Sequence, residues 1–119
     1  MNTTNKNSRP YKSATTDTLK ARRQELLDMM PDPAHVIRAS LITRSIKCGK
    51  PNCRCANGEG HQSLYLSSYY NGKTQLDSVP KVYKDKVSQC IKDYEDITGL
   101  LAELSCINLE LFRRREIDL

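Results

Sequence analysis

Three cysteines and one histidine lie close together in the chain and carry the side chains that zinc prefers. They are Cys48, Cys53, Cys55 and His61, with the spacing C-x4-C-x-C-x5-H. Three thiolates and one imidazole complete a tetrahedral shell around Zn²⁺ and leave no position open for a substrate. The sequence therefore predicts a structural zinc site, not a catalytic one.

The fourth ligand is the least constrained part of this prediction. An exposed polar histidine is the alternative for His61, and water, another side chain or a second chain would then complete the shell. A thiol switch is a further alternative, because flanking cations lower the pKa of a thiol. The segment has no C-x-x-C pair, however, and a catalytic cysteine would need a positioned histidine and a third group.

Positive charge gathers around the cysteines. Residues 1–60 hold eleven Lys/Arg against five Asp/Glu, whereas residues 61–119 hold eight against nine. No acidic residue lies between Asp32 and Glu59. A basic field of this kind suits a polyanion, most often nucleic acid, although a solubilising surface is the alternative. The predicted nucleic-acid contacts are Arg44, Lys47, Lys50, Arg54, Tyr65 and Lys73.

The elements that must position these residues form a small sheet between helices. Apolar residues at helical spacing predict a first helix, which Thr16 or Asp17 caps and the prolines at 31 and 33 end. A short second helix is expected from Pro33 to about Ala39. Three strands are then predicted at 41–47, 63–70 and 73–79, because apolar and polar residues alternate there. Asn71-Gly72 predicts a type I′ hairpin turn between the last two.

A long helix is predicted over residues 81–115. Its apolar residues recur at alternating threes and fours, which is typical of a seam that packs on a partner helix, and an asparagine within it could fix the register. The face is wide enough to pack on the first helix as well. The predicted partner-helix residues are Tyr94, Ile97, Leu101, Leu104, Asn108 and Leu111. A homo-oligomer through this helix is one expected consequence.

Together these elements predict an α+β fold: a zinc-stapled antiparallel sheet of about three strands between an N-terminal helix and a long C-terminal helix. Four segments are expected, namely a flexible basic arm (1–16), a helical segment (17–40), the zinc knuckle with its hairpin (41–80) and the long helix (81–119). The chain is 38% hydrophobic and has no tryptophan, so its core should be thin. Metal or a partner chain would then have to help stabilise it.

The composition also indicates a location and excludes some classes of protein. Residues 1–12 contain no apolar signal core, and no apolar run is long enough to span a membrane. We therefore expect a cytoplasmic protein without a membrane partner, in which thiols stay reduced. Two histidines in 119 residues cannot supply the active site of a tyrosine recombinase. We expect no enzyme activity.

Several motifs resemble a family of small bacterial mobile-element proteins. They are RSIKCGKPNCRC ending at Cys55, GEGH ending at His61, and INLELFRRR ending at Arg115. Over residues 17–116 the chain is most similar to the small third transposition protein of transposons that carry two tyrosine recombinases. Many members have Gly-Pro after the histidine, where this chain has Gln62-Ser63. This departure spares the predicted ligands.

The resemblance implies an accessory regulator of transposition that binds DNA, the recombinases, or both, and that lies at the nucleoid when bound. The alternative is a protein-interaction module that uses its C-terminal helix and does not contact DNA. Substitution of the basic residues near the cysteines would distinguish these two hypotheses.

Overall fold

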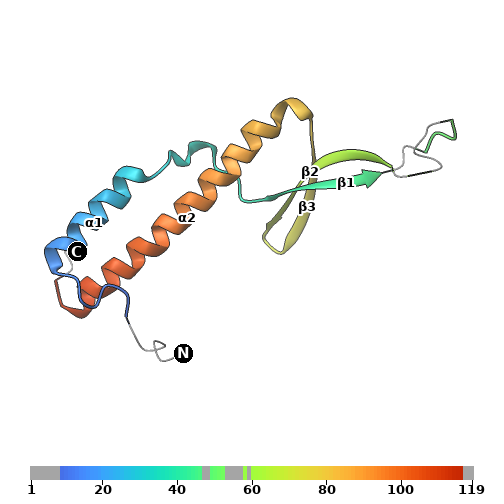
Figure 1. Ribbon diagram of the computed structural model, residues 1–119. Coiled ribbons are helices and arrows are strands. Elements are labelled where there is room, and N and C mark those ends of the chain that lie inside the picture. The colour runs from blue at the N-terminus through green and yellow to red at the C-terminus, as the bar shows by residue number, and fades with distance from the viewer. Residues whose placement is uncertain (1–8, 47–48, 53–57, 59, 117–119) are drawn as a thin grey trace. The chain divides into compact units, whose positions relative to one another are not determined.

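The computed structural model of the chain describes residues 9–46, 49–52, 58 and 60–116. Its elements, in order, are α1 (Thr16–Met29), the 3-10 turn η2 (Pro33–His35), β1 (Ser40–Ile46), β2 (His61–Tyr70), β3 (Lys73–Val79), the 3-10 turn η4 (Lys81–Tyr83) and α2 (Lys84–Arg113) (Figure 1). The predicted α+β fold, with one helix before a three-stranded antiparallel sheet and a long helix after it, is confirmed.

The chain forms two compact units. One comprises Met1–Asp32 with Asp96–Leu119, and the other comprises Pro33–Glu95. Helix α2 therefore contributes its first turns to the sheet-containing unit and its remaining turns to the helical unit. No helix among the described residues is long and apolar enough to cross a membrane.

Helix α1 begins at Thr16, one residue earlier than a cap at Thr16 would give and two earlier than a cap at Asp17 would give. Its N-cap is Thr15, whose side chain accepts a hydrogen bond from the backbone N–H of Thr18 at 3.1 Å. A threonine hydroxyl in this position satisfies one of the donors that a helix start leaves free. Asp17 lies instead in the first turn, where a negative charge suits the helix dipole. The helix ends before Pro31, as predicted.

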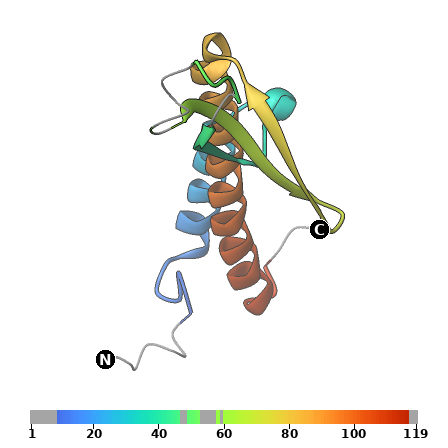
Figure 2. The ribbon, with the colours of Figure 1, turned by 90° about the vertical axis from the view of Figure 1, so that its right-hand side faces the viewer.

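The core of the helical unit is small and apolar. Leu19 and Leu26 of α1 are fully buried against Leu104, Ile107 and Leu111 of α2. The two helices lie side by side in both views (Figures 1 and 2). The buried residues of α2 are spaced by three and four and the two leucines of α1 by seven, so each helix presents one apolar stripe to the other. Burial of these apolar side chains stabilises the unit.

Residues 11–14, within the described residues just before α1, include side chains that pack, unlike the flexible arm predicted for residues 1–16. Tyr11 and Ala14 pack against the helical core. The guanidinium of Arg114 donates hydrogen bonds to the carbonyl oxygens of Tyr11 and Lys12, at 3.2 and 3.3 Å. The composition of this stretch predicted disorder because it did not reveal an arginine at the far end of the chain that binds its backbone.

The sheet has the order β1-β2-β3 with antiparallel neighbours. Asn71 and Gly72 have φ values of 51° and 80°, so the turn between β2 and β3 has the positive φ angles of the predicted type I′ hairpin. Strand β2 begins at His61, two residues before its predicted start, and β1 begins at Ser40. The predicted last residue of the first strand, Lys47, lies outside the described residues.

The short second helix expected to run to about Ala39 is only the 3-10 turn η2, which ends at His35. Beyond it, the backbone N–H of Ile37 donates to the carbonyl oxygen of Cys90 in α2 at 3.1 Å. That donor is therefore not available to a helix of its own. The contact ties the entry to β1 against the first turns of α2.

The register of the strands determines which side chains share a face. Thr43 pairs with Leu64, and Leu64 pairs with Val79. One face therefore carries the leucines of β2 together with Val79. Successive residues point to opposite sides of a sheet. The other face carries Arg44, Tyr65 and His61, because these alternate with the first set.

Candidate metal centre and nucleic-acid interface

The segment that holds the predicted zinc ligands leaves β1 and returns at β2. The last pair of the β1–β2 ladder joins Ile46 to His61. Beside it, the hydroxyl of Ser45 donates to the carbonyl oxygen of Gly60 at 3.1 Å. Directly paired residues of antiparallel strands have Cα atoms about 5 Å apart. The sheet therefore holds the two ends of the cysteine segment side by side.

Of the four predicted ligands, the structure describes His61 alone, as the exposed first residue of β2. Cys48, Cys53 and Cys55 lie outside the described residues. Among the residues that are described, no group of three or more His, Cys, Asp or Glu could hold a metal ion. The remaining cysteines, Cys90 and Cys106, are half-buried free thiols on α2. The zinc site stays a prediction.

One backbone feature inside the segment agrees with the chemistry of this donor set. Gly49, directly after the predicted ligand Cys48, has a φ of 81°. Glycine adopts this left-handed conformation without the steric cost that other residues meet. Pro51 and Asn52 follow in a turn. Ligands spaced this closely need such a tight reversal to reach one metal ion, so the described backbone is compatible with the predicted shell.

The predicted nucleic-acid contacts do not all lie on one surface. Arg44 and Tyr65 lie on the sheet face that includes His61, because Arg44 pairs with Ser63 and Tyr65 follows two residues later. Lys73 pairs with Tyr70 and lies on the opposite face, at the hairpin turn. The contacts described on the strands therefore divide between the two faces of the sheet, and their role in binding nucleic acid stays a prediction.

The basic residues among the predicted nucleic-acid contacts that the structure describes are available for a ligand. Arg44, Lys50 and Lys73 are exposed, and none forms an ion pair with another described residue. Lys47 and Arg54 lie outside the described residues. Tyr65 is half-buried, whereas Tyr69, two residues along the same face, keeps 58% of its surface exposed. Aromatic and cationic groups therefore share the face that begins next to the cysteine segment.

The predicted partner-helix residues divide into two groups. Leu104 and Leu111 are buried against α1, so their assignment to a partner chain is corrected: the first helix already covers them. Asn108 is half-buried and accepts a hydrogen bond from Arg23 of α1 at 3.4 Å. Leu101 is 53% exposed, and Tyr94 and Ile97 are half-buried. Leu101 remains the member best placed for a partner.

Sequence reasoning missed two lysines near the end of the sheet. Lys81 and Lys84 line a cavity of about 540 Å³ with residues of the strands. A signal was present in the sequence, because two lysines three residues apart follow the proline that ends β3 and lie where the helix begins. Their relation to the sheet depended on tertiary structure.

A family model for a domain of unknown function, DUF6788, matches residues 16–89. The chain belongs to this family. The DUF6788 match begins with α1 and ends in the first turns of α2, so it includes the cysteine segment and the whole sheet. No curated protein and no solved structure matches the chain. The description of this family assigns no activity.

Proposed function

We propose that this protein is a zinc-stabilised accessory factor of DNA transposition that binds DNA, the tyrosine recombinases of the element, or both. The resemblance of its cysteine and C-terminal motifs to small transposition proteins supports the biological setting. The observation that carries the DNA contact is the exposed Arg44, which shares a sheet face with Tyr65 and has no ion-pair partner among the described residues.

The proposed contact is electrostatic and independent of catalysis. Arginine and lysine side chains bind phosphate oxygens and position a protein on the duplex, while aromatic rings can lie against sugars. Lys50 extends the positive charge beyond the sheet, within the segment that begins at Cys48. Binding of this kind releases counterions, so its affinity should fall steeply as salt increases.

Zinc has a structural role in this proposal. Cys48, Cys53, Cys55 and His61 would hold the ion, which would fix the shape of the segment that carries Lys47, Lys50 and Arg54. The closed protein shell gives the ion no substrate position. Zinc would thus act through the surface that it stabilises, not by activating a substrate.

A protein-interaction module without DNA contact is the second candidate, and one observation favours it. Leu101, Leu109 and Phe112 of α2 remain 53%, 47% and 50% exposed. Exposed large apolar side chains on a helix are the kind of surface on which proteins associate when they form a patch. In this alternative the helix docks on a recombinase or on another copy of the chain, and the zinc site only stabilises the fold.

Fluorescence anisotropy with a labelled transposon-end duplex tests the proposal. The variant Arg44→Gln/Lys50→Gln should weaken binding by about tenfold at low salt and reduce the salt slope by about two, because two phosphate contacts are lost. Lys20→Gln/Lys86→Gln removes the same charge from exposed positions on the helices and should retain most of the affinity.

Recombinase pull-down with the same proteins separates the two candidates. DNA affinity that falls while recombinase binding persists supports the accessory factor. Wild-type protein with no DNA affinity at low salt, alone or with the recombinases, would leave only the interaction module.

A further inference from the structure

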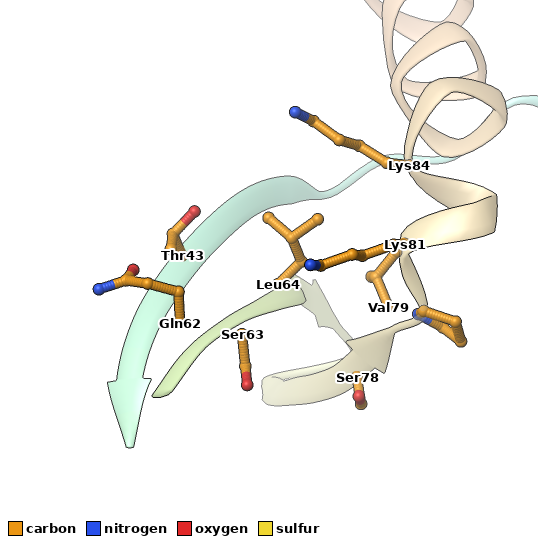
Figure 3. Close-up of a pocket in the computed structure, with 9 residues that line it drawn as sticks. Thr43, Gln62, Ser63, Leu64, Ser78, Val79, Lys81 and Lys84 are labelled. Atoms are coloured by element: carbon orange, nitrogen blue, oxygen red, sulfur yellow. The ribbon is translucent and has the colours of Figure 1, made fainter. Parts of the chain in front are cut away.

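A cavity of about 540 Å³ lies against the sheet face that carries Leu64 and Val79 (Figure 3). Val79 is buried and Leu64 is half-buried, whereas the surrounding Thr43 and Gln62 are exposed. The cavity therefore has an apolar floor and a polar rim that is open to solvent. Its volume falls within the range typical of ligand-binding cavities.

Two lysines reach this cavity from the segment that follows β3. Lys81 belongs to η4 and Lys84 is the first residue of α2. Figure 3 shows Lys81 extending over Leu64, with Lys84 projecting above the same side of the sheet. Both side chains are exposed, and neither forms an ion pair with a described residue. Among the described residues that line the cavity, none is an aspartate or a glutamate.

These features together restrict the chemistry of an occupant. A phosphate group alone would neutralise the lysines but would gain nothing from the floor of Leu64, Val79 and Pro80. A neutral apolar group would cover the floor and leave both ammonium groups without a counter-charge. An occupant that combines an apolar side chain with neighbouring carboxylates would both cover the floor and pair with the two ammonium groups.

We propose that this cavity docks an acidic, apolar segment of a protein partner. An apolar side chain of that segment would lie on the floor formed by Leu64 and Val79, and its carboxylates would face Lys81 and Lys84. Among the strand residues whose burial is described, Val79 is the one buried side chain, so this sheet face still has apolar surface to cover. Duplex DNA fits less well, since it presents phosphates and sugars but no alkyl side chains.

The docking surface is distinct from the proposed DNA contact. Leu64 and Val79 lie on one face of the sheet, and Arg44 and Tyr65 lie on the other. The inference goes beyond the proposed function and does not require it, because any partner with this chemistry could occupy the cavity. Failure of DNA binding would leave it intact, and its own failure would leave DNA binding intact.

Titration of the isotope-labelled full-length protein, followed by NMR, tests the docking surface. The probe is a short synthetic peptide that alternates leucine and glutamate. It should shift the amide signals of Leu64, Val79 and Lys84, and it should bind several-fold more weakly to Lys81→Gln/Lys84→Gln. Lys20→Gln/Lys86→Gln, with the same loss of charge elsewhere, should bind like the wild type. These conservative surface changes leave the floor and the fold in place.

Three further probes decide between occupants. A peptide that alternates leucine and glutamine should bind more weakly than the acidic one, and so should a peptide of glutamate without leucine. Octanoate, as a free carboxylate with an apolar body, should bind far more weakly than the peptide. The proposal fails if any of these three binds as tightly as the acidic peptide. It also fails if a DNA duplex produces the same shifts at lower concentration. Equal loss of peptide affinity in Lys81→Gln/Lys84→Gln and in the control Lys20→Gln/Lys86→Gln would overturn it as well.

Discussion

At the scale of single residues, the helical unit contains a charge that sequence patterns do not reveal. Glu110 is 1% exposed and lies within 3.6 Å of Arg9, Arg113 and Arg114, the last at 3.0 Å. Its atom Oε1 has no hydrogen-bond partner among the described residues. A buried carboxylate is stabilising only when its cations remain in place. This residue therefore connects the last turn of α2 with the segment before α1.

The arginines around Glu110 make the stability of the protein dependent on pH. The hydrogen bond from Arg114 is the largest influence, and it holds the pKa of the Glu110 carboxyl below its ordinary value of 4.5. Arg22, followed by Tyr11, lowers the pKa of Glu103 in the same way. A lowered pKa in the folded state stabilises the protein above the ordinary value, and this contribution is lost as the pH falls through the folded-state pKa.

We expect Glu110→Gln to be less stable than the wild type at neutral pH, because three arginines would then surround a neutral group. The difference should narrow as the pH falls below the ordinary value of 4.5 and then through the lower pKa of the folded state, where the wild-type carboxylate also becomes protonated. Urea unfolding at a series of pH values measures this. Glu116→Gln, at an exposed position, is the control and should show little effect at any pH. A pH-independent difference for Glu110→Gln would contradict the ionic explanation.

Substitution by alanine should have opposite effects on stability at Gly72 and at Gly99. Gly72 has a φ of 80° in the hairpin turn, so Gly72→Ala should destabilise the protein by about 1 kcal/mol. Gly99 is exposed within α2, and an added Cβ there would meet no neighbouring atom. Gly99→Ala should stabilise by about 0.5–1 kcal/mol. Thermal unfolding of both variants tests the two signs, and equal signs would show that backbone conformation does not decide the effect.

At the scale of elements, the sequence predicts whether a segment is a helix or a strand better than it predicts which side of that element is buried. The alternation in β2, the Asn71-Gly72 turn and the proline at the end of β3 together place the hairpin, since these signals are local. Which side of α2 is buried does not depend on local sequence signals alone. The predicted seam includes the exposed Leu101 and omits Ile107 and Glu110, which are buried. Only the position of α1 decides which of several apolar stripes becomes the core.

The cysteine segment shows the same limit for the candidate site. Its ligand types and glycines could be read directly, but the side of the sheet taken by each basic residue depends on pairing register. Arg44 and Lys73 both carry charge near the strands, and the register separates them. Lys81 and Lys84 are visible as a basic pair after the proline, but their place at the cavity beside Leu64 depends on tertiary structure and does not follow from the sequence.

Two leucines in the predicted seam provide a test of the helix faces. Leu104→Ala should destabilise the protein by about 2–5 kcal/mol, because it leaves a cavity in the core between α1 and α2. Leu101→Ala should change stability by less than about 0.5 kcal/mol, since that side chain is half exposed. Chemical denaturation gives both values. If Leu101 docks on a partner, its variant should lose complex formation while it keeps its stability.

At the scale of the whole molecule, the described apolar core is confined to a few side chains. Five leucine and isoleucine residues form the core of the helical unit, and Val79 is the buried apolar residue described in the sheet-containing unit. A sheet with so little buried surface is marginal by itself. This agrees with the expectation from composition that the core is thin, and the contribution of metal or a partner to stability stays a prediction.

Zinc removal tests that contribution directly. We expect purified protein to contain one zinc ion per chain, and a chelator should lower its melting temperature and broaden the amide signals of β1 and β2. Cys53→Ser should lose zinc, whereas Cys90→Ser and Cys106→Ser should retain it because these thiols lie on α2. Elemental analysis and thermal unfolding provide the measurements. Wild-type protein that folds fully without metal would contradict the structural role.

The pair formed by Ile46 and His61 has a thermodynamic consequence for such a site. By closing the cysteine segment at its base, the β1–β2 ladder removes chain entropy that an unpaired segment would lose on binding an ion. Metal affinity and sheet stability are then thermodynamically linked, so a change that weakens one also weakens the other. A substitution at the distant hairpin, such as Gly72→Ala, should therefore weaken zinc binding without touching a ligand, by an amount set by the fraction of molecules in which the ladder is open.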